Sequence, residues 1–274
     1  FVDVQPSEIA KFMMILWAGF MLAKQERSGV DHIAVLKLIA PAFALCIILV
    51  MAGSDLGTAS VFACILAGLL WVSGLRLGIF GIGLSVGLVG LTAAILTSPY
   101  RVQRFMVFLN PFAEDQYKLY GWQPAHSLLG LASGGLFGVG LGASRQKWGN
   151  LAEAHTDFIF AVIGEELGLF GTLATLLLLS ILIFSIFKLA LRANDPMVRY
   201  VASGFGVWIA IQTILNIGSA ISVLPVVGVT LPLVSYGGSA LIASYMGIGF
   251  VLGAARRDPV IYKELKETGI KWLR

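Results

Sequence analysis

Charged residues, cysteine and histidine are all scarce in this 274-residue chain. Only 12% of its residues are charged, whereas 58% are hydrophobic, and it has two cysteines and three histidines. Soluble domains carry roughly 25% charged and 45–50% apolar residues, so a soluble fold could not bury this much apolar surface. Because Cys46 and Cys64 lie inside apolar runs, the sequence excludes a disulfide framework and a cysteine-based metal site.

The basic residues are also too dispersed for nucleic-acid binding. The net charge is +4, but lysine and arginine fall between apolar runs and form no patch with stacking aromatic residues. The chain opens at Phe1 with no initiator methionine and no cleavable signal pattern, directly before an apolar segment. We therefore expect no nucleic-acid partner, and we expect the true beginning of the protein to be missing.

Long apolar runs are abundant. Seven of them approach the roughly 17–25 residues that cross a bilayer as a helix; they are 6–23, 36–53, 57–74, 78–97, 165–187, 201–222 and 238–254. The 32 glycines fit such a fold, because small residues let helices approach closely in lipid. The predicted fold class is an all-α polytopic membrane protein, with residues 1–274 forming one transmembrane domain.

The basic residues also predict an orientation, because cytoplasmic loops are enriched in lysine and arginine. If the loop after the first span is cytoplasmic, alternation places 13 of the 19 basic residues on that side. They are Lys24, Arg27, Lys37, Arg76, Lys188, Arg192, Arg199, Arg256, Arg257, Lys263, Lys266, Lys271 and Arg274. The amino end is then outside, and residues 256–274 form a cytoplasmic tail.

Residues 98–156 form a long loop on the outer side, and a loop of this length indicates function rather than linkage. Within it, the apolar and glycine-rich stretch 124–144 is typical of a re-entrant or interfacial segment. A second such stretch, 224–239, carries two prolines and three glycines. Both stretches are expected to shape a cavity at the outer face.

Asp157 is the strongest candidate for chemistry. It lies between the polar run that contains His155 and an apolar run, and ionisable groups at a membrane boundary are costly unless they are paired or functional. Partial desolvation can move the pKa of such a carboxylate toward a value suited to a general base. The alternative is that Thr156 or Asp157 caps the following helix, with Glu165 and Glu166 solvated or paired.

A second polar cluster lies at the outer end of the first span. Glu8 and Lys11 are one helical turn apart, so the simplest interpretation is an ion pair behind a helix start capped by Ser7. The predicted topology nevertheless places both residues on the same side as Asp157, which favours a shared site. Asp55, between two glycines, is expected to have a turn role.

Four cations on the outer side run against the general charge distribution. They are Arg101, Arg104, Arg145 and Lys147. They could attract anionic lipid headgroups, or they could bind a phosphate-bearing lipid, since guanidinium groups suit phosphate oxygens. The sequence leaves both interpretations open.

Taken as strings, these segments resemble the SEDS family of bacterial cell-wall polymerases, which includes FtsW, RodA and SpoVE. The resemblance is carried by QPSEIAK at 5–11, DLGTA at 55–59, YRVQRFMVFLNP at 100–111, GLGASRQKWGNLAEAHTDFIFAVIGEELG at 140–168 and LPVVGVTLPLVSYGGSA at 224–240. Within the family, SRQKW and ARRDP are more similar to FtsW, the division member, than to RodA. Family members have ten spans, so the resemblance implies that the first three are absent here.

The resemblance implies polymerisation of lipid II into glycan strands at the outer face of the bacterial cytoplasmic membrane. Asp157 matches the family's essential aspartate and would take a proton from the attacking sugar hydroxyl. Residues expected to contact the pyrophosphate or sugar are Glu8, Lys11, Arg101, Arg104, Arg145 and Lys147, with Gln123 and His155 as weaker members. A divalent cation, Mg or Mn, is a candidate cofactor, and no organic cofactor is expected.

The resemblance also implies partners: lipid II, the undecaprenyl-pyrophosphate-linked glycan, a class B penicillin-binding protein and other divisome proteins. His126 departs from the glutamine that many relatives carry there. Three alternatives remain at this point, namely an elongation-type RodA polymerase, a lipid II flippase or other transporter, and a scaffold that only docks a partner. A transporter should carry ionisable residues near the bilayer midplane, whereas those of this chain cluster toward one face.

Overall fold

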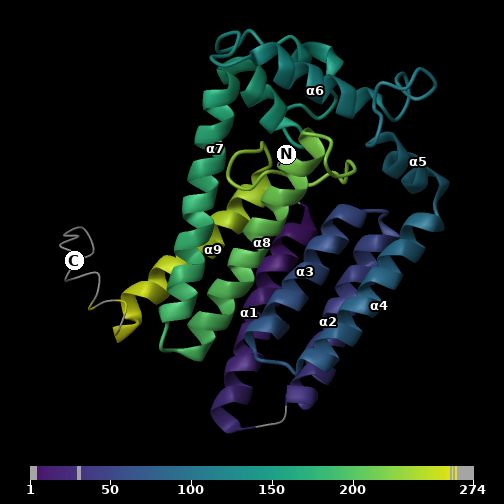
Figure 1. Cartoon of the computed structure of the whole chain (residues 1–274). Helices are drawn as coiled ribbons and strands as arrows, with labels where there is room; N and C mark the ends of the chain where they lie inside the picture. Colours follow the sequence, from purple (N-terminus) through teal and green to yellow (C-terminus); the bar gives the residue numbers. More distant parts are fainter. Residues whose placement is uncertain (1–4, 30–31, 260, 262, 264–274) are drawn as a thin grey trace. The chain divides into compact units, whose positions relative to one another are not determined.

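The computed structural model describes residues 5–29, 32–259, 261 and 263. Within them the regular elements are helices, and the seven expected spans are α1 (Pro6–Ser28), α2 (His32–Ala52), α3 (Leu56–Val72), α4 (Leu77–Leu96), α7 (Ile159–Arg192), α8 (Pro196–Ala220) and α9 (Gly238–Arg257) (Figure 1). Six of them are long and apolar enough to cross a membrane, and α3, with 17 residues, is slightly shorter. The all-α polytopic fold class is thus confirmed.

The chain forms two compact units that interleave along the sequence. Unit 1 comprises residues 1–84, 181–211 and 238–274, and unit 2 comprises residues 85–180 and 212–237. Three helices, α4, α7 and α8, therefore begin in one unit and end in the other. The expectation of one transmembrane domain stays a prediction.

Unit 1 is built on close helix contacts made possible by glycine. A Cβ added to Gly68 would lie 2.6 Å from a methyl group of Val207, and one added to Gly247 would lie 2.1 Å from the ring of Phe205. Both distances are shorter than any real Cβ contact, so a larger residue would force the helices apart. Small residues let helices meet in this way where lipid offers no hydrophobic drive for association.

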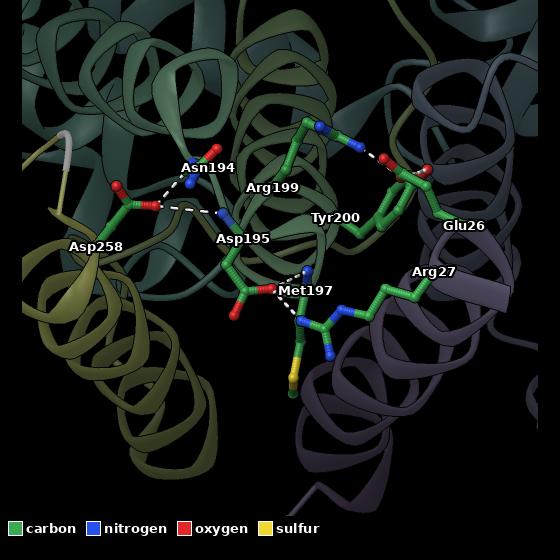
Figure 2. A network of polar contacts seen from close by, with 8 residues as sticks. All are labelled: Glu26, Arg27, Asn194, Asp195, Met197, Arg199, Tyr200 and Asp258. Carbon is green, nitrogen blue, oxygen red and sulfur yellow. Dashed lines mark hydrogen bonds and ion pairs between the residues drawn. The ribbon is translucent and has the colours of Figure 1, made fainter.

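At one end of unit 1, polar side chains connect α1, α8 and α9 (Figure 2). Arg27 donates to Asp195 at 2.7 Å, and Glu26 accepts from Arg199 and from the Tyr200 hydroxyl. The Asp258 carboxylate accepts from the backbone N–H groups that precede α8, those of residues 194 and 195. The basic loops after α1 and between α7 and α8 therefore lie at the same end of this unit, as the charge distribution requires.

Unit 2 contains the long loop, and the first of its two glycine-rich stretches is partly helical. Two helices occur before α7, namely α5 (Pro99–Val107) and α6 (Trp122–Gly134), followed by a π-helical turn, η1 (Gln146–Asn150). The glycine-rich segment after α6 bonds to α7 at its kink: Val139 N–H donates to Glu165 O at 2.9 Å, and Leu169 N–H donates to Gly135 O at 2.9 Å. Gly168 makes the kink, with φ of 68°.

The second glycine-rich stretch connects α8 and α9 as residues 221–237, without a regular helix. Its apolar side chains, among them Leu231, Val226 and Val234, pack on a core that includes Phe158 and Ile217. It is therefore an anchored loop rather than a solvated linker. The predicted tail, 256–274, begins with the last residues of α9, and most of the rest lies outside the described residues.

Candidate functional site

Asp157 lies in a turn immediately before α7 and is partly buried. The carbonyl of Phe158 accepts the first bonds of α7, from the N–H groups of Ala161 and Val162, which places the N-cap at Phe158. The Thr156 hydroxyl donates to the backbone and side-chain oxygens of Glu153, which precedes it in the chain, rather than capping α7. Thr156 is therefore not the N-cap of α7, and Asp157 lies one residue before the N-cap.

The turn that carries Asp157 is connected to the loop 221–237 through Asn216, Ser235 and Tyr236. Asn216, fully buried in α8, donates to Asp157 O at 2.7 Å and to Val229 O at 2.8 Å. The Ser235 hydroxyl donates to Thr156 O, and Tyr236 N–H donates to His155 O at 2.9 Å. The backbone on both sides of the carboxylate is therefore fixed, which limits where its oxygens can lie.

The same loop approaches the Asp157 carboxylate at a glycine. A Cβ added to Gly228 would lie 3.5 Å from Asp157 Oδ2, and Gly228 has φ of 69°, a left-handed conformation that favours glycine. Two residues earlier, Val226 O accepts from the Arg104 guanidinium at 3.5 Å. The loop thus contacts both a candidate base and a candidate phosphate-binding cation.

The guanidinium groups of Arg101 and Arg104 on α5 are both held by contacts with other groups of the chain. Arg104 lies over the Tyr100 ring, 4.6 Å from its centroid, and Arg101 donates to Ala94 O at 2.9 Å. An arginine that donates one N–H to a carbonyl keeps four others for further acceptors. These contacts orient the two side chains and leave donors for an anion.

Arg145 directly precedes η1, and Lys147 lies within it. Lys147 forms an ion pair with Glu166, whereas the Arg145 side chain is exposed. Glu166 is thus paired, as one of the sequence interpretations expected. Glu165 is buried rather than solvated, and it has no ion-pair partner among the described residues. It accepts from Ser144 Oγ at 2.5 Å and from Arg145 N–H at 3.0 Å.

Glu8 and Lys11 belong to unit 1, where they form the expected ion pair at 2.8 Å. Both side chains are almost completely buried, and the Lys11 ammonium lies 5.1 Å from the centroid of the fully buried Trp208 ring. Asp55 caps α3 by accepting from Thr58 N–H at 2.8 Å, which fits its expected turn role. That the pair shares a site with Asp157 stays a prediction.

The weaker candidates differ from one another. The imidazole of His155 is exposed, with its ring 5.7 Å from that of Tyr236, and Gln123 is partly buried on α6. His126 is buried and stacks on Trp122 at 3.9 Å, while its Nδ1 contacts the Trp122 carbonyl at 2.9 Å. His126 therefore has a structural role in holding α6.

The chain matches a family described as cell cycle proteins, FtsW/RodA/SpoVE, over residues 1–259. The chain belongs to this family. A protein of Tolumonas auensis named "Probable peptidoglycan glycosyltransferase FtsW" is 41% identical over 92% of this chain, which covers 66% of that relative. A protein of Taylorella equigenitalis with the same name is 36% identical over 98% of this chain and 74% of its own length.

Among solved structures, one reported as "Structural coordination of polymerization and crosslinking by a peptidoglycan synthase complex" is similar to this FtsW/RodA/SpoVE member. Its TM-score is 0.73 at 28% identity, over 93% of this chain and 71% of the other.

The sequence pattern does not single out Asn216 and Glu165, which bond to the backbone of candidate site residues in this FtsW/RodA/SpoVE member. Asn216 was one isolated amide in an apolar run, and Glu165 was considered only as solvated or paired. An asparagine in a membrane span is a usable signal, because a buried amide must find partners. No group of three or more Asp, Glu, His or Cys side chains suited to a metal occurs among the residues that the structure describes.

Proposed function

We propose that the protein is a peptidoglycan glycosyltransferase that polymerises lipid II at the outer face of the bacterial cytoplasmic membrane during cell division. One observation carries the proposal: in a chain of the FtsW/RodA/SpoVE family, a single loop lies beside the Asp157 carboxylate and accepts from Arg104. The same loop therefore approaches a candidate base and accepts from a candidate cation for a phosphate.

In the proposed reaction, Asp157 accepts the proton of the 4-hydroxyl of the incoming lipid II sugar as that oxygen attacks the anomeric carbon of the growing chain. The bond from this carbon to the pyrophosphate oxygen breaks, and undecaprenyl pyrophosphate leaves with the electron pair. The anomeric configuration is inverted. Fixing the backbone around Asp157 through Asn216 supports this role, because a base must lie within hydrogen-bond reach of its proton.

Cations stabilise the leaving group in this proposal. The Arg104 and Arg101 guanidinium groups keep donors for pyrophosphate oxygens. That Lys11 and Glu8, which pair with each other in unit 1, also contact the substrate stays a prediction. A divalent cation would take the pyrophosphate oxygens among its ligands, since Mg binds through one or two carboxylates together with substrate phosphates. No step above depends on such an ion.

The proposed orientation places the amino end outside and the carboxyl end in the cytoplasm, which puts Asp157 on the outer side. The arrangement at one end of unit 1 supports it, because several basic loops meet there. The proposed partner is a class B penicillin-binding protein, supported by the similarity to a synthase complex whose reported functions are polymerisation and crosslinking. Other divisome proteins are further proposed partners.

The test is glycan polymerisation from labelled lipid II by the whole protein with its partner in detergent. Asp157→Asn should lower the rate by about 10²- to 10⁴-fold, the usual contribution of general acid–base catalysis. Asp115→Asn is the matched control, because Asp115 is an exposed carboxylate in the same long loop. Full activity of Asp157→Asn would refute the base assignment, and transport of lipid II without polymer would favour the transporter alternative.

A further inference from the structure

Glu165 holds the segment that carries Arg145, and it does so from a buried position. Its side chain is 2% exposed, and its two oxygens accept from three donors. Oε2 accepts from Ser144 Oγ at 2.5 Å and from Gln146 N–H at 3.3 Å, while Oε1 accepts from Arg145 N–H at 3.0 Å. The Ser144 hydroxyl in turn accepts from Lys147 N–H at 3.3 Å.

Burying a carboxylate at this position costs free energy. Burying an ionised group requires compensation by a partner of opposite charge or by several hydrogen bonds. Among the residues that the structure describes, no cation pairs with Glu165, and the nearby Lys147 pairs with Glu166 instead. All three donors to Glu165 are neutral groups of one short segment, 144–146. The carboxylate therefore fixes the conformation of that segment.

The segment carries an exposed cation, Arg145. Arg145 is exposed and has no ion-pair partner in the part of the chain that the structure describes, whereas the Lys147 ammonium is engaged by Glu166. The carboxylate contacts the backbone N–H of Arg145 itself, and it receives the N–H of the next residue as well. The position from which the Arg145 guanidinium extends is thus set by Glu165.

Glu165 is itself held on a rigid base. Its own carbonyl accepts from Val139 N–H at 2.9 Å, and a Cβ added to Gly134 would lie only 1.9 Å from Gly164 O, so α6 and α7 touch directly before it. Because backbone contacts on both sides immobilise the start of this side chain, its carboxylate can transmit that rigidity to the Arg145 segment.

We propose that Glu165 is a positioning residue that fixes Arg145 to bind the pyrophosphate of the lipid-linked substrate. The proposal rests on the proposed function, since it takes the ligand from it. A Glu165→Gln change should disturb this arrangement without removing bulk. An amide has one accepting oxygen, so either Arg145 N–H or Gln146 N–H would face another donor.

The first experiment measures binding of undecaprenyl pyrophosphate to the whole protein in detergent. Arg145→Ala should weaken binding about tenfold, which corresponds to about 1.4 kcal/mol, close to the lower end of the usual range for a hydrogen bond to a charged group. Glu165→Gln should weaken it by a similar factor, and the double variant should bind no worse than Arg145→Ala alone. Glu114→Gln, an exposed carboxylate in the same loop, is the matched control and should bind normally.

Additive losses in the double variant would overturn the proposal, because Glu165 would then act independently of Arg145. If Glu165→Gln fails to fold, Ser144→Ala serves instead, since it removes one donor and leaves the carboxylate. Ser144→Ala should weaken binding about threefold, and only when Arg145 is present. Normal binding by Ser144→Ala in that case would also count against the proposal.

A second readout does not depend on the substrate. Hydrogen exchange at the amides of residues 145 and 146 should be slow in the unaltered protein and at least about tenfold faster in Glu165→Gln. Unchanged exchange would overturn the positioning role. If the unaltered protein forms no polymer yet the binding and exchange results hold, the proposed function fails while the positioning role stands.

Discussion

The two units differ in how they accommodate charge. In unit 1 a buried carboxylate, Glu8, meets a buried ammonium, Lys11, and exposed pairs such as Arg27 with Asp195 connect helix ends. In unit 2 the buried carboxylate of Glu165 meets only neutral donors, and Arg101 and Arg104 bond to carbonyl oxygens. Unit 1 neutralises its buried carboxylate Glu8 with an ammonium, whereas unit 2 holds its buried carboxylate Glu165 with neutral donors.

The two arrangements should affect stability differently, one through global unfolding and the other through the local geometry of a loop. An internally cancelled pair is costly to break because one charge is left buried, but the pair as a whole can be replaced by neutral residues. A charge held by backbone donors instead fixes a loop, so its loss should disturb local geometry more than global stability.

Lys11→Met should be the most destabilising single change, because Glu8 would stay buried without its cation. Breaking a buried pair by removing one partner costs about 3–5 kcal/mol. Thermal or chemical unfolding in detergent measures it. The double variant Glu8→Gln with Lys11→Met should recover most of the lost stability without recovering polymerisation. A double variant as unstable as the single one would show that the pair is not internally cancelled.

Asn216→Ala should come next, since it leaves the partly buried carbonyl of Asp157 and the buried carbonyl of Val229 without this donor. Each unmet acceptor costs about 1–3 kcal/mol. Polymerisation should fall by more than global stability would explain, because the turn that carries Asp157 loosens. The matched control is Ser219→Ala, whose hydroxyl bonds, in the part of the chain that the structure describes, to carbonyl groups of its own helix. Equal losses of activity in both variants would contradict a specific role for Asn216.

Gly134→Ala should destabilise unit 2 by about 1–3 kcal/mol, the usual cost of overpacking, because the added Cβ would meet Gly164 O at 1.9 Å. Gly78→Ala in α4 is the control, since a Cβ there meets nothing within 4 Å. It should be neutral or stabilise by up to about 1 kcal/mol through helix propensity. Resistance to protease, compared between the two variants in detergent, distinguishes them.

The sequence predicted the helices more completely than the site. Long apolar runs located the seven spans because periodicity and length are local properties. The Glu8–Lys11 pair was equally local, being one helical turn apart. Contacts such as Asn216 with Asp157, or Glu165 with Ser144, join positions 59 and 21 residues apart, and no local pattern specifies them. The turn before α7 could be singled out, but not what holds it.

Arg27→Ala should have the smallest effect of the series. Its side chain is 60% exposed and that of Asp195 is 45% exposed, and exposed ion pairs contribute about 0–1 kcal/mol. Asp195 also accepts from Met197 N–H at 2.9 Å, so its capping of α8 survives the loss of the guanidinium. Unfolding at low and at high salt checks the origin of the effect, because screening should remove the difference from the unaltered protein. A loss that approaches that of Lys11→Met would mean that this end of unit 1 depends on ion pairs as strongly as its buried interior does.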